Sequence, residues 1–81
     1  MRLDKYLKVS RILKRRSVAN EACSGGKVEV NGKVAKPSVR LKVGDVVCVS
    51  YSTGNFVFKV VMLNENAKKE DADKMYEIIS G

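Results

Sequence analysis

The dipeptide Asn31-Gly32 constrains the fold of this chain more than any other feature of its sequence. It lies in the segment 27–35, in which apolar and polar residues alternate on either side of the pair. Asn-Gly in this setting favours a two-residue type I′ turn, because both central residues must adopt a positive φ. The segment therefore predicts a β-hairpin whose Val28 and Val30 face a hydrophobic core.

Two short helices are predicted ahead of this hairpin. The first spans residues 2 to about 11, and its apolar face combines residues at helical spacing, namely Leu3, Tyr6, Leu7 and Ser10. The second begins between residues 14 and 17 and ends at Gly25-Gly26, since glycine readily adopts the left-handed conformation found at helix ends. A tight basic connection joins the two helices.

The second half of the chain is predicted to consist mainly of strands. Gly44-Asp45 marks a turn, and the apolar segments 46–51 and 56–63 are expected to form an antiparallel pair. A final amphipathic helix is predicted over about residues 67–80. The expected fold class is α+β, with two N-terminal helices packed on a small, predominantly antiparallel sheet and a short C-terminal helix.

Length and composition exclude several classes of protein. Residues 1–81 leave room for a single domain with one modest core, because a chain of this size buries only roughly 60% of its unfolded surface. Cys23 and Cys48 lack the spacing of a metal-binding pair and the sequence has no histidine, so we expect no metal site and no cofactor. No apolar run is as long as the apolar part of a signal peptide or approaches the roughly 18 residues of a membrane span. We therefore expect a cytoplasmic protein.

Basic residues are concentrated in the N-terminal half. Residues 1–42 carry 12 basic and 3 acidic side chains, whereas residues 43–81 carry 4 basic and 6 acidic ones. A basic face on a small folded domain is typical of nucleic-acid binding, because each neutralised phosphate releases counterions. The candidate RNA contacts are the seven cations among the first sixteen residues: Arg2, Lys5, Lys8, Arg11, Lys14, Arg15 and Arg16.

Arg2 and Arg16 are the leading candidates, because they stand at the ends of the predicted helix pair; the alternative for every candidate is a solvated surface charge. Asp4 is the one acid among the seven cations. We expect it to orient a neighbouring arginine through a charge-assisted bond, with compensation of the helix N-terminal charge as the alternative. Asn31 and Gly32 are expected to be structural.

The order of these elements and the residues at their joints resemble a known family. The runs RLDKYL (2–7), RRSVA (15–19), GKVEVNG (26–32) and GD (44–45) together resemble the S-four type, or αL-motif, RNA-binding domain. The ordered set covers roughly residues 1–51 and is specific, whereas any single piece is common. Within that family the chain is similar to bacterial ribosome-associated quality-control factors and to the ribosome-associated heat-shock protein of the large subunit.

The resemblance implies a function that composition alone does not. Proteins of this kind bind large ribosomal subunits that are still obstructed by peptidyl-tRNA, where they contact 23S rRNA and the tRNA. They support rescue or tailing of the nascent chain, and a separate tailing factor recruits alanyl-tRNA. Such a role requires charge and shape but no catalytic group. We also expect the protein to be a monomer when it is not bound to the ribosome.

Other functions remain open at this point. An enzyme is disfavoured, because the chain has no histidine base, no suitably spaced pair of acids and no glycine loop that cradles phosphate before a helix. A generic rRNA-binding or ribosome-assembly module would share the basic face. A basic protein adaptor or a membrane-surface binder would need an exposed apolar stripe beside the cations, whereas Leu3 and Leu7 are expected to face inward.

Overall fold

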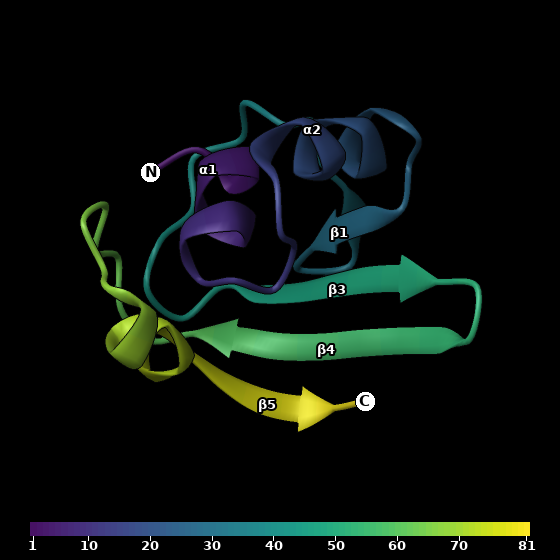
Figure 1. Cartoon of the computed structure of the whole chain (residues 1–81). Coiled ribbons are helices and arrows are strands. Elements are labelled where there is room, and N and C mark those ends of the chain that lie inside the picture. The colour runs from purple at the N-terminus through teal and green to yellow at the C-terminus, as the bar shows by residue number, and fades with distance from the viewer.

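The computed structural model describes residues 1–81, in which two helices pack on one side of an antiparallel sheet (Figure 1). The helices are α1 (Leu3–Val9), α2 (Arg16–Ser24) and a 3-10 helix, η1 (Lys69–Met75). The strands are β1 (Val28–Val30), β2 (Lys33–Val34), β3 (Val46–Tyr51), β4 (Gly54–Val60) and β5 (Tyr76–Ser80), in the sheet order β2-β1-β3-β4-β5. None of the helices has both the length and the apolar character needed to cross a membrane. The predicted α+β class is confirmed.

The hairpin forms at the predicted dipeptide. Val30 pairs with Lys33, so the turn between the strands consists of two residues. Asn31 and Gly32 have φ values of 51° and 83°, the positive values that a type I′ turn requires. Val28 is fully buried, as expected for the core face of β1. The prediction of a two-residue hairpin is therefore confirmed.

Helix α1 supplies one side of the core. Leu3, Tyr6 and Leu7 are fully buried and Ser10 is almost so, which confirms the predicted phase of the helix. The ring of Tyr6 stacks on Phe58 of β4, with the ring centroids 6.1 Å apart. Helix α2 and the strands complete the core with Ala19, Cys23, Val28, Val47, Val49 and Val60. The helix pair is thereby fixed on the sheet by its apolar faces.

The Tyr6 hydroxyl ties α1 to the C-terminal segment. It donates a hydrogen bond of 2.7 Å to the backbone oxygen of Met75, and burial raises the pKa of the phenol, which keeps its proton. The same oxygen accepts the backbone N–H groups of Val61 and Met62 at 3.0 and 3.1 Å. Strand β4 ends at Val60, earlier than predicted, and these bonds hold the two residues that follow it against the end of η1.

The predicted C-terminal helix over about residues 67–80 is correct only in its first part. The 3-10 helix ends at Met75, and Tyr76–Ser80 forms strand β5, in which Ile78 lies opposite Phe58 of β4. Tyrosine and isoleucine favour strands, and β5 pairs with backbone groups of β4 that a helix would leave without partners. The prediction of helix beyond residue 75 is wrong for this reason.

Candidate nucleic-acid interface

The N-terminal end of α1 is fixed by hydrogen bonds to a distant segment. The first backbone N–H groups of an α-helix have no partner within the helix. Here the N–H of Leu3 donates to the backbone oxygen of Val39 at 2.8 Å. The N–H of Asp4 donates to the backbone oxygen of Pro37 at 3.2 Å, and the N–H of Lys5 donates to the Asp4 carboxylate at 2.8 Å. These bonds hold Asp4 in place at the start of the helix.

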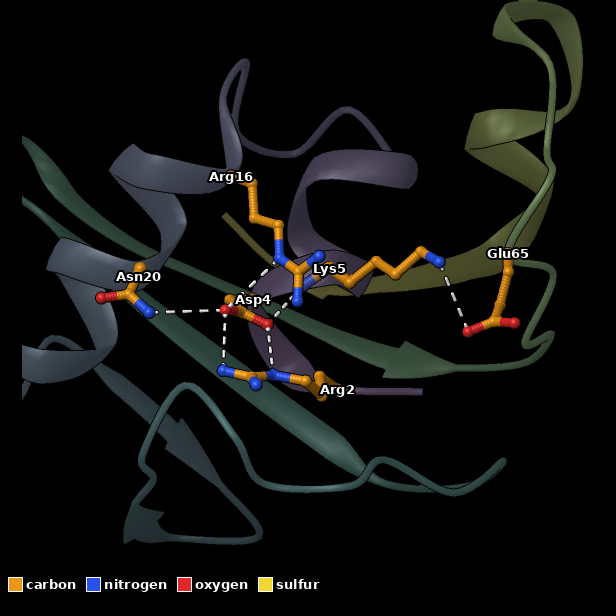
Figure 2. Close-up of polar contacts among 6 residues, drawn as sticks. All are labelled: Arg2, Asp4, Lys5, Arg16, Asn20 and Glu65. Atoms are coloured by element: carbon orange, nitrogen blue, oxygen red, sulfur yellow. Dashed lines mark hydrogen bonds and ion pairs between the residues drawn. The ribbon is translucent and has the colours of Figure 1, made fainter.

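Asp4 lies at the centre of a group of polar side chains that we call the Asp4 cluster: Asp4, Arg2, Arg16 and Asn20 (Figure 2). The Asp4 side chain is 3% exposed, and its two oxygens accept bonds from Nε and Nη2 of Arg2, each at 3.2 Å. Nε of Arg16 lies 3.5 Å from Oδ2, and Nδ2 of Asn20 donates to the same oxygen at 3.4 Å. Arg16 and Asn20 reach one carboxylate because residues four apart share a face of α2.

The Asp4 carboxylate keeps its negative charge at neutral pH. Burial by itself would raise the pKa of Asp4. This effect is outweighed, and the pKa is held below its usual value, by hydrogen bonds from Asn20, the N–H of Lys5 and Arg2, and by the charge of Arg16. The Arg2 and Arg16 side chains remain 42% and 49% exposed. One buried anion thus orients two guanidinium groups that are still open to solvent.

Lys5 and Arg15 lie outside the Asp4 cluster. Figure 2 shows the Lys5 side chain pointing away from Asp4 towards Glu65, in the loop after β4, and the Lys5 Nζ to Glu65 Oε1 distance is 3.5 Å. Arg15 immediately precedes α2 as its N-cap residue and is exposed. Lys5 follows Asp4 and Arg15 precedes Arg16 in the sequence, so both cations add positive charge near the arginine pair.

Three further cations surround a depression at the C-terminal end of α1. Lys8, Arg11 and Lys14 line this space of about 210 Å³, and Glu65 also lines it. Arg11 has a φ of 62°, in the left-handed region that residues with a Cβ seldom adopt, and its N–H donates to the backbone oxygen of Lys8 at 3.0 Å. A tight reversal therefore gathers these three side chains at one point.

Asn31 fastens the hairpin to the turn that precedes β3. Its backbone N–H donates to the oxygen of Val46 at 2.7 Å, and its Oδ1 accepts the N–H of Val46 at 2.9 Å. Nδ2 of Asn31 donates to Asp45 at 3.1 Å, and the other Asp45 oxygen accepts the N–H of Lys42 at 2.9 Å. The Asn31 and Asp45 side chains therefore connect the turn of the hairpin to the turn before β3.

Asn20 and Glu65 were not singled out from the sequence. Asn20 follows Arg16 by one helical turn, and this spacing is the only signal that could have placed it beside Asp4. Glu65 meets Lys5 across 60 positions of sequence, so no local pattern indicates the contact. Tertiary packing places both residues beside the candidate RNA contacts.

The other groups of chemical interest are the Cys23 thiol and the side chains that could hold a metal ion. Burial, and to a smaller degree the charge of Asp4, raises the pKa of the Cys23 thiol to about 11, so this thiol is protonated at neutral pH. No three side chains of the metal-ligating types come together. The arrangement as a whole is suited to holding anions on a basic surface.

Comparison with known proteins identifies the family. The family model of the S4 domain matches residues 1–47, which confirms the resemblance of the sequence. The RQC P-site tRNA stabilizing factor of Streptococcus pneumoniae is 54% identical over 80 residues, covering 99% of this chain and 91% of that protein. The protein of the same name from Listeria monocytogenes is 51% identical over 79 residues, covering 98% and 86%.

A solved structure shares the fold over almost the whole chain. The trimeric structure of Vibrio cholerae heat shock protein 15 matches with a TM-score of 0.90 at 28% identity, covering 99% of this chain and 82% of that one. Sequence, family model and fold therefore agree. The chain belongs to the S4 domain family, in the group that includes the RQC P-site tRNA stabilizing factors.

Proposed function

We propose that this chain is an RNA-binding, ribosome-associated quality-control factor that acts in the cytoplasm. It binds large ribosomal subunits obstructed by peptidyl-tRNA, contacts 23S rRNA and the tRNA, and stabilises that tRNA during tailing or rescue of the nascent chain. A tailing factor that recruits alanyl-tRNA cooperates with it. The S4 domain match and the names of the relatives support this role, which is one of binding and not of catalysis.

The observation that carries the proposal is the arginine pair fixed by Asp4. Folded RNA presents phosphates and unpaired bases, and a guanidinium can bind a phosphate with two parallel bonds or stack on a base. Because Asp4 already orients Arg2 and Arg16, less conformational freedom is lost when RNA binds. The proposed RNA contacts are Arg2, Lys5, Lys8, Arg11, Lys14, Arg15 and Arg16.

Cosedimentation from cells tests the proposal. Tagged protein should travel with large subunits that carry peptidyl-tRNA, and release of the nascent chain before sedimentation should reduce that association. The double substitution Arg2→Ala/Arg16→Ala should remove the protein from the particles. The control Lys68→Ala/Lys69→Ala takes the same charge from exposed positions in the C-terminal half and should leave the association intact.

Other distributions would favour the other functions. Sedimentation with assembly precursors of the ribosome would support a generic rRNA-binding or assembly module. Preferential binding to anionic vesicles over RNA would support a membrane-surface binder. An unchanged distribution of the Arg2→Ala/Arg16→Ala variant would remove the fixed arginine pair from the interface.

A further inference from the structure

A second depression of the surface is lined by Arg2 and by residues of two distant segments. It occupies about 540 Å³ between the C-terminal end of α2 and the segment that follows β2. Arg2 lines it, as do Ser24 at the end of α2 and Lys36 and Ser38 after β2. The volume is within the range of about 300–1,000 Å³ that is typical of small-ligand sites.

The lining combines apolar surface with hydrogen-bonding groups. Val34, although apolar, is 65% exposed, and the half-buried Pro37 also lines the depression. Ser24 and Ser38 are exposed residues, and their hydroxyl groups can donate or accept hydrogen bonds. An apolar wall bordered by such groups suits a flat heteroaromatic ring that has polar atoms along its edge.

The charge of the lining selects an anionic ligand. Of the nine residues that line this depression, Arg2 and Lys36 are cations and none is an acid. The other two depressions of the molecule each include an acid, Glu65 in one and Glu21 in the other. A phosphate attached to the bound ring would therefore meet two positive charges and no negative one among the lining residues.

Arg2 connects the depression to the Asp4 cluster. Its Nε and Nη2 are bonded to the Asp4 carboxylate, so the plane of the guanidinium is fixed while Nη1 is left for another partner (Figure 2). A fixed guanidinium plane can stack on an unpaired base. The depression is thus continuous with the surface proposed to bind RNA.

We infer that this depression receives one unpaired base of the bound RNA. The base lies against Val34 and Pro37, the guanidinium of Arg2 stacks on it or bonds to its edge, and Lys36 faces its phosphate. The inference rests on the proposed function and adds to it a site for a splayed single-stranded nucleotide, which binding of duplex phosphates alone would not need.

Two matched substitutions test this inference. Val34→Asp places an acid in the wall of the depression, whereas Val43→Asp places one at a valine that is almost as exposed, 63% against 65%, and lines no depression. Large subunits carrying peptidyl-tRNA are treated with base-specific modifying reagents, with and without each protein. Wild type and Val43→Asp should protect the same unpaired base. Val34→Asp should lose that protection and bind at least about 5-fold more weakly than Val43→Asp.

The outcomes separate the inference from the proposed function. Equal affinity and equal protection by Val34→Asp and Val43→Asp would overturn the inference and leave the proposed function in place. Failure of the wild-type protein to bind the particles would overturn both. Thermal unfolding checks the fold of each variant. If Val34→Asp does not fold, Ser24→Phe, which fills the depression from the end of α2, should produce the same loss.

Discussion

Replacing Asp4 with asparagine should destabilise the fold and make its stability less sensitive to acid. The change Asp4→Asn keeps the size of the side chain but removes the charge shared by Arg2 and Arg16. The amide NH2 of the new asparagine would also face the N–H groups of Arg2, Arg16 and Asn20, which are themselves donors. The loss should therefore be larger than that of an ordinary surface charge.

The magnitude follows from the contacts of Asp4. A hydrogen bond to a charged group contributes about 1.5–3 kcal/mol, and part of the bond from the Lys5 N–H survives because the asparagine oxygen still accepts it. Each arginine pair contributes only about 0.2–1 kcal/mol, since the Arg2 and Arg16 side chains are 42% and 49% exposed and water screens their charges. Together these terms predict a cost of about 2 kcal/mol at neutral pH.

Urea unfolding across a pH series provides the assay. The folded pKa of Asp4 lies below the unfolded value of about 3.9. Its stabilisation is therefore complete above the unfolded value and is lost as the pH falls through the folded one, so the cost of Asp4→Asn should shrink in acid. The control Asp71→Asn removes an exposed pair with Lys74 and should cost less than about 0.5 kcal/mol. An Asp4→Asn cost no larger than this control, or one that persists in acid, would refute the reasoning.

Three other substitutions give distinct results. Leu7→Ala should cost about 2–5 kcal/mol in urea unfolding because Leu7 is fully buried, and a cost below about 0.5 kcal/mol would contradict the packing of α1. Tyr6→Phe should cost only about 0.5–1.5 kcal/mol, since the Met75 oxygen keeps two backbone donors; a melting temperature lowered by more than about 15 °C would contradict this. Arg11→Gly should weaken RNA binding in a filter assay. Its free energy of unfolding should stay unchanged or rise by up to about 1 kcal/mol, because glycine accepts the φ of 62°. A fall in its stability would argue against strain at that position.

Local patterns were sufficient to predict the helix pair and the hairpin. The phase of α1 depends on residues three and four positions apart, and the turn at Asn31 depends on two adjacent residues. The C-terminal segment shows where local patterns fail. Met75 and Ile79 fit a helical spacing, yet the free edge of β4 recruits the chain from Tyr76 onward as a strand.

The candidate site was predictable as a set of cations but not as an arrangement. The seven basic residues are visible in the sequence, and so is the single acid among them. The contacts of Asp4 with Arg16 and Asn20 exist only because α2 packs beside α1. The pair between Lys5 and Glu65 likewise depends on the loop after β4. Tertiary packing thus decides which cations pair with an acid.

A salt series on purified large subunits, with and without peptidyl-tRNA, tests the central claim that fixed arginines recognise the obstructed particle. Arg15→Ala, which removes an exposed neighbouring charge, should mainly reduce the slope of log K against log salt by about 0.7–0.9. Arg16→Ala should in addition lose about 1–3 kcal/mol of binding to the peptidyl-tRNA particle, and Arg16→Lys should restore this only in part. Equal binding by wild type, Arg16→Ala and Arg16→Lys, with the fold intact, would contradict the account and leave diffuse electrostatics as the only basis of binding.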